Sequence, residues 1–108
     1  MSAPEAREAA PLFAALGDPT RLELLGRLGA GAPMSIAALS RDAPVSRQAM
    51  TKHLDVLLVA GLVTCERRGR ERVWRAEPAR LEEARAHLQR IAAQWDDALE
   101  RLRRFVEE

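Results

Sequence analysis

The spacing of apolar residues toward the end of the chain sets the tightest limit on its fold. From residue 81 onward these side chains recur in steps of three and four positions, at Leu81, Ala84, Leu88, Ile91, Trp95, Ala98, Leu102 and Phe105. This heptad pattern predicts a single helix over residues 79–107 with one apolar stripe. Such a helix is about 40 Å long, at 1.5 Å per residue. The rest of the chain makes a domain only about 26 Å across, so the stripe outruns the core that one chain can offer.

An apolar stripe that one chain cannot cover needs a partner. The simplest partner is the same helix of a second copy, packed across a two-fold axis, although the helix could also fold back on its own chain. We therefore expect a homodimer that forms through the terminal helices. Its predicted interface consists of Leu12, Phe13, Leu16, Leu81, Leu88, Ile91, Trp95, Leu99, Leu102 and Phe105.

The charge of the chain is balanced overall but uneven along its length. With 108 residues the chain is long enough for one domain, and its formal net charge is only +1. Residues 46–80, however, carry eight Lys or Arg against four acidic residues, while the segments on either side are slightly negative. DNA affinity depends on local rather than global positive charge, because it comes from neutralising nearby phosphates. The middle of the chain is therefore the candidate DNA-binding surface, unless it is merely a solvated charged face.

The cysteine content and the lack of long apolar runs indicate where in the cell the protein is found. The single cysteine excludes an intrachain disulfide framework and a zinc cluster made of cysteines alone. The longest apolar runs, such as residues 54–62, are too short to span a membrane. Residues 1–7 lack the basic start and apolar core of a secretory signal. We expect a cytoplasmic, nucleoid-associated protein without contact to membranes.

Capping and breaking residues define two helices in the first thirty positions. A short helix through Phe13 and Leu16 is predicted to have Pro11 near its start. Asp18 can cap a second helix, because the following proline suits the first helical position and leucines recur at helical spacing. Glycines at positions 29 and 31 should end this helix.

Two further helices are separated by a short break. Ser35 caps a brief helix over residues 36–41, and Ser46 caps a longer one that closes at Ala60 and Gly61. After Gly61 the apolar period changes to two, which predicts strands over residues 62–67 and 72–76 around a polar turn. A helix pair with a short turn is a helix-turn-helix, and a basic hairpin directly after it is a wing.

The predicted fold is therefore mainly α with a small β-hairpin wing, in the order α-α-α-α-β-β-α. One winged helix-turn-helix domain spans residues 1–108, with the helix-turn-helix over 35–60 and the wing over 62–76. The terminal helix over residues 79–107 serves dimerisation. An ordinary small domain whose helix pair only builds core is the alternative.

The helix after Ser46 presents a polar side to DNA. Arg47 and Gln48 lie in its first turn, where a recognition helix meets base edges, and can bind guanine and adenine in a two-pronged fashion. Thr51 can touch a thymine methyl group, and Lys52 a base or a phosphate. The arginines of the wing would follow the backbone or enter the minor groove. The predicted DNA-binding residues are Ser46, Arg47, Gln48, Thr51, Lys52, His53, Arg67, Arg68, Arg70 and Arg72.

No residue pattern indicates catalysis. Ser46 and His53 could be imagined as a nucleophile and its base, but they are roughly two helical turns apart. No orienting third group and no phosphate-binding glycine loop accompany them. We expect no enzymatic activity and no cofactor. For His53, packing at the edge of the core is an alternative to a phosphate contact.

Four segments together resemble a known family. They are Phe13-Ala-Ala-Leu-Gly-Asp-Pro-Thr-Arg-Leu-Glu-Leu-Leu25, Ser35-Ile-Ala-Ala-Leu39, Val45-Ser-Arg-Gln-Ala-Met-Thr-Lys-His-Leu-Asp-Val-Leu57 and Ala60-Gly-Leu-Val63. The chain resembles the ArsR/SmtB regulators over residues 9 to 107. The resemblance implies a homodimeric winged-helix repressor whose binding to an inverted-repeat operator on double-stranded DNA is controlled by a ligand or modification.

The chain departs from this family in the residues that bind the controlling ligand. Metal-sensing members resemble one another in a cysteine pair at the start of the first helix of the reading motif, where this chain has Met34-Ser-Ile-Ala-Ala. Others carry Asp-x-His and a further His with Glu along the last helix, where this chain has only His87. The usual metal sites are therefore not expected. The stretch from His87 to Val106 is similar to a branch without metal ligands, so the effector is unknown.

Two other functions remain open at this stage. Cys65 is followed by Arg67 and Arg68, which could lower the pKa of its thiol and make the protein a redox-sensing repressor. A small buried strand residue is the plainer interpretation of Cys65. The winged helix could also serve as a protein-interaction module that does not bind DNA.

Overall fold

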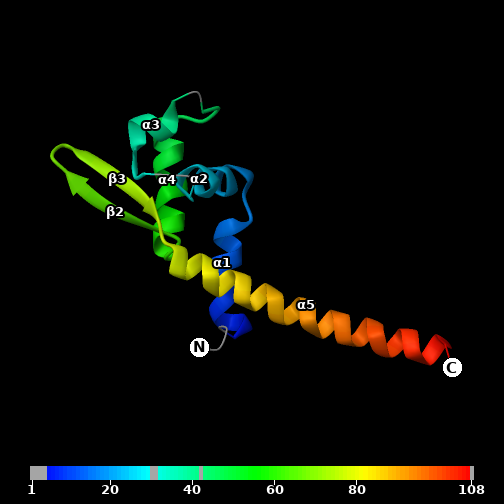
Figure 1. Cartoon of the computed structure of the whole chain (residues 1–108). Helices are drawn as coiled ribbons and strands as arrows, with labels where there is room; N and C mark the ends of the chain where they lie inside the picture. The colour runs from blue at the N-terminus through cyan, green and yellow to red at the C-terminus, as the bar shows by residue number, and fades with distance from the viewer. Residues whose placement is uncertain (1–4, 30–31, 42, 108) are drawn as a thin grey trace.

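Four helices, a small sheet and a long terminal helix follow one another along the chain (Figure 1). The computed structural model describes residues 5–29, 32–41 and 43–107; the predictions made for residues 1–4 and Gly31 lie outside this range. The elements are α1 (Ala6–Leu16), α2 (Pro19–Gly29), β1 (Met34–Ser35), α3 (Ile36–Ser40), α4 (Arg47–Val59), β2 (Val63–Arg68), β3 (Glu71–Ala76) and α5 (Pro78–Glu107).

The predicted order is confirmed, with one strand added. The hairpin of β2 and β3 is extended by β1 to a three-stranded antiparallel sheet in the order β1-β3-β2. Met34 is paired with Trp74, and Ser35 with Val73. Two strands were expected, because a strand of two residues is too short to show an alternating pattern. This strand ties the start of α3 to the base of the wing.

The first helix is longer than predicted. It begins at Ala6 rather than close to Pro11, which lies inside it. Proline inside a helix removes a backbone N–H, here the one that would pair with the carbonyl of Arg7. Pro11 is exposed, however, while Ala9, Leu12 and Ala15 share the buried side of the helix. Packing along this side holds the helix together across the proline.

The predicted caps are confirmed at three helix starts. The hydroxyl oxygen of Ser35 accepts a hydrogen bond from the N–H of Ala38, and that of Ser46 from the N–H of Ala49, both at 3.2 Å. A carboxylate oxygen of Asp18 accepts from the N–H of Arg21 at 3.1 Å. These bonds satisfy backbone donors that have no partner inside the helix. They fix where α2, α3 and α4 begin.

One core holds the first four helices against the sheet. Its largest fully buried side chains include Trp74 from β3, and leucines from α1, α2, α3 and α4 belong to the same cluster. Leu12 is 0% exposed within this core. The prediction that Leu12 belongs to a dimer interface is therefore wrong, because its side chain is fully buried within its own chain. Phe13 and Leu16 remain partly exposed beside it.

The terminal helix leaves the core after its first turns. It has 30 residues, and Ala84 is its only buried residue among those the structure describes. The described chain measures 68 × 30 × 24 Å, with a radius of gyration of 18.1 Å against about 13 Å for a compact chain of a hundred residues. Leu81 still packs on the core, and the ring of Phe13 lies 5.8 Å from that of His87. Beyond these contacts α5 extends alone (Figure 1).

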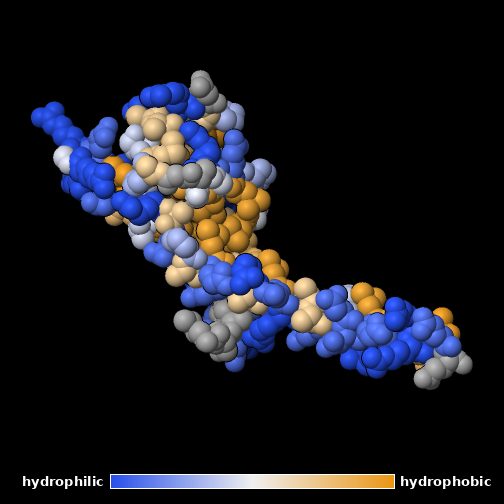
Figure 2. All heavy atoms as spheres, viewed as in Figure 1, coloured by the Kyte–Doolittle hydropathy of each residue, from blue (hydrophilic) through white to orange (hydrophobic). Residues whose placement is uncertain are grey.

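The apolar stripe of α5 is uncovered over most of its length. Trp95 is 65% exposed and Phe105 79% exposed, which is unusual for side chains of this size. Figure 2 shows apolar surface on the outer part of α5, set among hydrophilic side chains. The exposed stripe residues are Leu88, Ile91, Trp95, Leu99, Leu102 and Phe105. The expectation that this helix outruns the core of one chain is confirmed.

Gly61 ends α4 in a left-handed conformation, as predicted, with φ at +78°. Its N–H donates to the carbonyl of Leu58 at 3.0 Å, and the N–H of Leu62 donates to the carbonyl of Leu57 at 2.9 Å. Together these bonds form a Schellman motif. The motif turns the chain sharply from the recognition helix into the wing.

Gly61→Ala is expected to lower the free energy of unfolding by about 1–2 kcal/mol, because a side chain disfavours the left-handed region. Gly26→Ala is a matched control, since its new methyl group would meet no atom within 4 Å in the regular part of α2. This control should instead stabilise the protein by about 0.8–1 kcal/mol. Urea unfolding followed by circular dichroism compares the two. An equal effect of both substitutions would contradict the role given to Gly61.

Candidate nucleic-acid interface

The exposed side of α4 carries the residues predicted to contact bases. Arg47, Gln48 and Lys52 are exposed, while Met50, Leu54 and Leu57 on the opposite side are buried. Arg47, Gln48, Thr51 and Lys52 line one shallow hollow together with Ile36 of α3. The structure thus brings these predicted residues together on one surface.

Two hydroxyl groups at the start of this helix form hydrogen bonds with the protein backbone. The hydroxyl of Thr51 donates to the carbonyl of Arg47 at 2.9 Å, so its methyl group remains the part suited to a thymine contact. Ser46 accepts the capping bond and is exposed, so its own proton is free to be donated. Both arrangements agree with the predicted roles of these residues.

The two faces of the wing differ in charge. Residues paired across the hairpin point to the same side, and this side alternates along each strand. Cys65 is paired with Trp74, and Arg67 with Arg72. These pairs share the face on which Trp74 is buried, toward the helices. The opposite face holds Arg68 and Arg75 together with Glu66 and Glu71, so its arginines are offset by carboxylates.

Arg68 and Arg72 therefore lie in different surroundings. The Nε of Arg68 lies 3.6 Å from a carboxylate oxygen of Glu66, and both side chains are well exposed. The Nε of Arg72 donates to the sulfur of Cys65 at 3.3 Å, and its guanidinium carbon lies 4.7 Å from the ring centre of Trp74. Arg72 is thus held against the sheet on the helix side. Of the predicted wing contacts, Arg68 is the least suited to binding a phosphate.

The hairpin turn supports a close approach to DNA. Gly69 has a φ of +63° in the two-residue loop that joins β2 and β3, and nothing lies within 4 Å of the place where a side chain would begin. Such a φ at the first loop position suits the twist of a tight hairpin. Arg70 completes the loop at the exposed tip.

A hollow of about 300 Å³ separates α4 from the wing. We call it the helix–wing groove; it is lined by Ser35, Ile36, Ala37, Arg47, Thr51, Arg70, Glu71, Arg72 and Trp74. It joins the start of α3, the first turns of α4 and the tip of the wing. Arginines that are more than twenty positions apart in the sequence therefore face one space.

His53 lies on another side of α4 than the exposed residues. An N–H of Arg21 donates to its Nδ1 at 3.2 Å, and that nitrogen is 3.8 Å from a carboxylate oxygen of Asp18. Arg21 also donates to the carbonyls of Ala14 and Ala15, at the end of α1. The side chain of His53 is 22% exposed. It ties the recognition helix to the corner between α1 and α2, and only its Nε2 remains for a DNA contact.

Asp18 and Arg21 position the recognition helix through this link, a role that was not predicted. The backbone N–H of Arg21 holds the pKa of the Asp18 carboxyl below its usual value, and the positive charge of the Arg21 side chain adds to this effect. The Asp-Pro-Thr-Arg motif predicts the cap of α2. The contact between Arg21 and His53, which lie 32 positions apart, has no local signal in the sequence.

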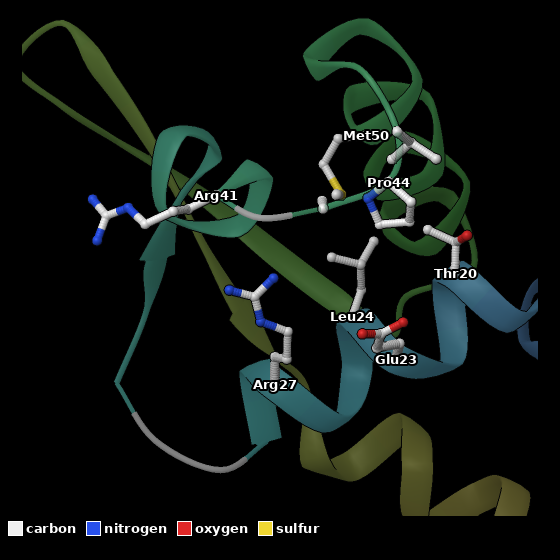
Figure 3. Close-up of a pocket in the computed structure, with 9 residues that line it drawn as sticks. Thr20, Glu23, Leu24, Arg27, Arg41, Pro44 and Met50 are labelled. Atoms are coloured by element: carbon white, nitrogen blue, oxygen red, sulfur yellow. The ribbon is translucent and has the colours of Figure 1, made fainter.

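Arg27 fixes the first helix of the helix-turn-helix. Its guanidinium donates to the carbonyls of Leu39 at 2.8 Å and Ala38 at 3.2 Å, which lie in the last turn of α3. Arg27 also borders a second hollow of about 300 Å³ between α2 and the segment before α4 (Figure 3). Glu23 and Thr20 give this hollow a polar rim, while the side chain of Arg41 points away from it.

Neither a cluster of metal ligands nor a membrane-spanning helix occurs in the described part of the chain. Within residues 5–29, 32–41 and 43–107, no group of three or more His, Cys, Asp and Glu is placed to hold a metal ion. Over the same ranges, none of the helices is both long and apolar enough to cross a bilayer. Cys65 is a free thiol and half-buried.

Known proteins with the same architecture identify the class. Residues 16–66 match a family described as a helix-turn-helix domain. The chain is 41% identical over 85 residues to the HTH-type transcriptional regulator Rv2034 of Mycobacterium tuberculosis, covering 79% of this chain and 76% of that protein. It is also similar to the structure of an ArsR-like transcriptional regulator from Rhodococcus sp. RHA1, at 43% identity, a TM-score of 0.78 and 92% coverage of each chain.

A further similar structure is that of the transcriptional repressor BigR from Xylella fastidiosa, at 27% identity and a TM-score of 0.63, with 75% of this chain and 83% of that chain covered. The helix-turn-helix, the basic wing and these relatives define a winged-helix DNA-binding protein. The chain belongs to the ArsR-like family of HTH-type transcriptional regulators. It is thus a DNA-binding transcriptional regulator, as the resemblance in its sequence implied.

Proposed function

We propose that the protein is a repressor that binds an inverted-repeat operator as a homodimer. The observation that carries this proposal is the uncovered stripe of α5, which has the spacing of a helix-pairing seam. Pairing across a two-fold axis would place two copies of α4 side by side. Two recognition helices about 34–36 Å apart fit successive major grooves. The repressor role is supported by the similarity to BigR, itself a transcriptional repressor.

The proposed contacts follow from exposure and from the face of each element. Arg47 and Gln48 bind base edges, and Thr51 and Lys52 extend this contact along the groove. In the wing, Arg67, Arg70 and Arg72 neutralise phosphates, with a smaller contribution from Arg68. Ser46 and the Nε2 of His53 are candidates for further phosphate contacts. The protein needs no cofactor or catalytic group for this function, and it would act in the cytoplasm, where the nucleoid lies.

Selecting bound fragments from the host genome tests the proposal. We expect enrichment of an inverted repeat whose half-sites are centred about 10–10.5 base pairs apart, or a multiple of this distance. The site would also name the regulated genes and suggest the signal. Enrichment of single, unpaired half-sites would contradict the dimeric mode. A protein that fails to bind even random duplex at low salt would instead be an interaction module.

Removing a wing arginine should weaken binding to all sequences alike. Arg70→Gln is expected to lower the slope of log affinity against log salt by about 0.9, the value for one phosphate contact on duplex DNA. Arg75→Gln is the matched control, since Arg75 lies on β3 on the face away from Trp74. Fluorescence anisotropy at several salt concentrations measures both slopes. An unchanged slope for Arg70→Gln would remove it from the interface.

A redox-sensing repressor that acts through Cys65 is the second candidate. It is favoured by the hydrogen bond from Arg72 to the sulfur, because oxidation of the thiol would alter this bond and disturb a proposed DNA contact. Cys65→Ser should then abolish the release of DNA by peroxide while leaving DNA affinity intact. If the serine variant releases DNA under peroxide as the original protein does, this candidate is wrong.

A further inference from the structure

The helix–wing groove gathers positive charge from two separate elements. Arg47 comes from the first turn of α4, whereas Arg70 and Arg72 come from the wing. Glu71 is the only acidic residue among the described residues that line the groove. The guanidinium groups of Arg47 and Arg70 have no hydrogen-bond or ion-pair partner in the described part of the chain. The groove therefore carries an excess of positive charge that the protein itself does not neutralise.

One of these arginines is already held in place. Arg72 donates from Nε to the sulfur of Cys65, and the ring of Trp74 supports its guanidinium group. The two terminal nitrogens are not used by any described residue. A side chain fixed in this way loses little freedom when it binds an anion, which favours binding.

The polar groups of the groove match a compact oxyanion. Arginine presents its donors in a planar fork that pairs with phosphate oxygens, and several arginines together neutralise more than one negative charge. The ring of Trp74 forms part of the same wall and packs against the guanidinium group of Arg72.

We infer that the helix–wing groove is a binding site for one phosphate group, held by Arg47, Arg70 and Arg72. In the complex with DNA, this group is a backbone phosphate, and in that respect the inference rests on the proposed function. Without DNA, a small phosphate monoester occupies the same place. Because Arg47 is also proposed to bind a base, such a compound competes with DNA and acts as an inducer.

Tryptophan fluorescence can follow the groove directly. The chain has two tryptophans, so Trp95→Phe leaves Trp74 as the only emitter and keeps the α5 stripe apolar. Inorganic phosphate is titrated against potassium chloride at equal ionic strength. A bound phosphate would contact the guanidinium of Arg72 beside Trp74. We therefore expect a saturable change in the emission of Trp74 with phosphate but not with chloride. Adding Arg70→Gln, which leaves Arg72 in place beside Trp74, should weaken phosphate binding at least tenfold, whereas adding Arg75→Gln should leave it unchanged.

The same protein, titrated with a DNA duplex, distinguishes the two sources of phosphate. A change in Trp74 emission with both inorganic phosphate and DNA, together with competition between them, supports the inference in full. A change with DNA alone assigns the site to the backbone phosphate and overturns the inducer role. If neither ligand changes the emission while DNA still binds by anisotropy, the inference is wrong and the proposed function stands. Loss of the phosphate response in Arg75→Gln would also overturn it.

Discussion

Replacing both Arg47 and Gln48 by alanine is expected to abolish the preference of the protein for its operator over random DNA. Both side chains are exposed at the start of α4, where a recognition helix meets base edges. A two-pronged base contact contributes about 1–3 kcal/mol of discrimination, so the pair accounts for at least about a 30-fold preference. Competition between operator and random duplex in a mobility-shift assay measures this ratio.

The controls for this prediction separate specificity from folding and from general affinity. Neither side chain belongs to the core, so the double variant should keep its helical content and its oligomeric state. Arg70→Gln should weaken operator and random DNA equally, because phosphate contacts position a protein without identifying a sequence. If the double alanine variant kept the operator preference of the original protein, α4 would not be the recognition helix.

The order of the elements and the position of the basic surface could be predicted because their signals are local. Caps at Ser35 and Ser46 mark helix starts that the structure places at the next residue. Gly61 marks the end of α4 through its conformational freedom. The basic residues of α4 and the wing could be assigned to one region by counting charge along the chain. Each of these inferences depends on residues within one element.

The rest depends on contacts between distant parts of the chain. The strand β1 exists because Met34 and Ser35 meet Trp74 and Val73, about forty positions away. Leu12 was assigned to a dimer interface because apolar spacing alone does not tell which helix covers a side chain; in the structure, the protein's own core covers it. The link between His53 and Arg21 joins residues 32 positions apart and likewise has no local signal, while the DNA contact of His53 stays a prediction.

The distribution of charge over the wing also required the structure. The sequence shows Arg67, Arg68 and Arg72 as one basic run on either side of a turn. The strand register assigns Arg67 and Arg72 to the face near α4 and leaves Arg68 beside Glu66. The sequence thus shows that this segment is basic, but only the pairing of β2 and β3 shows which face of the wing carries each arginine. The helix–wing groove is the result of this pairing.

Leu102→Glu is expected to convert the proposed dimer into monomers and to weaken operator binding. Leu102 lies in the outer part of the exposed stripe of α5, and burying a leucine contributes about 1.5–3 kcal/mol. A symmetric interface contains each residue twice, so the dissociation constant should rise at least about a hundredfold. Sedimentation velocity measures this change. With only one half-site bound at a time, affinity for the inverted repeat should fall to that for a single half-site.

Ala93→Glu is the matched control, because it adds the same charge to the same helix on the side away from the heptad stripe. This variant should sediment as the original protein does. Circular dichroism at the concentration of the sedimentation experiment shows whether α5 stays helical in both variants. A folded Leu102→Glu variant that remains a dimer would mean that the stripe does not form the interface. The two recognition helices would then have to be brought together by another surface, or a single copy would bind DNA alone.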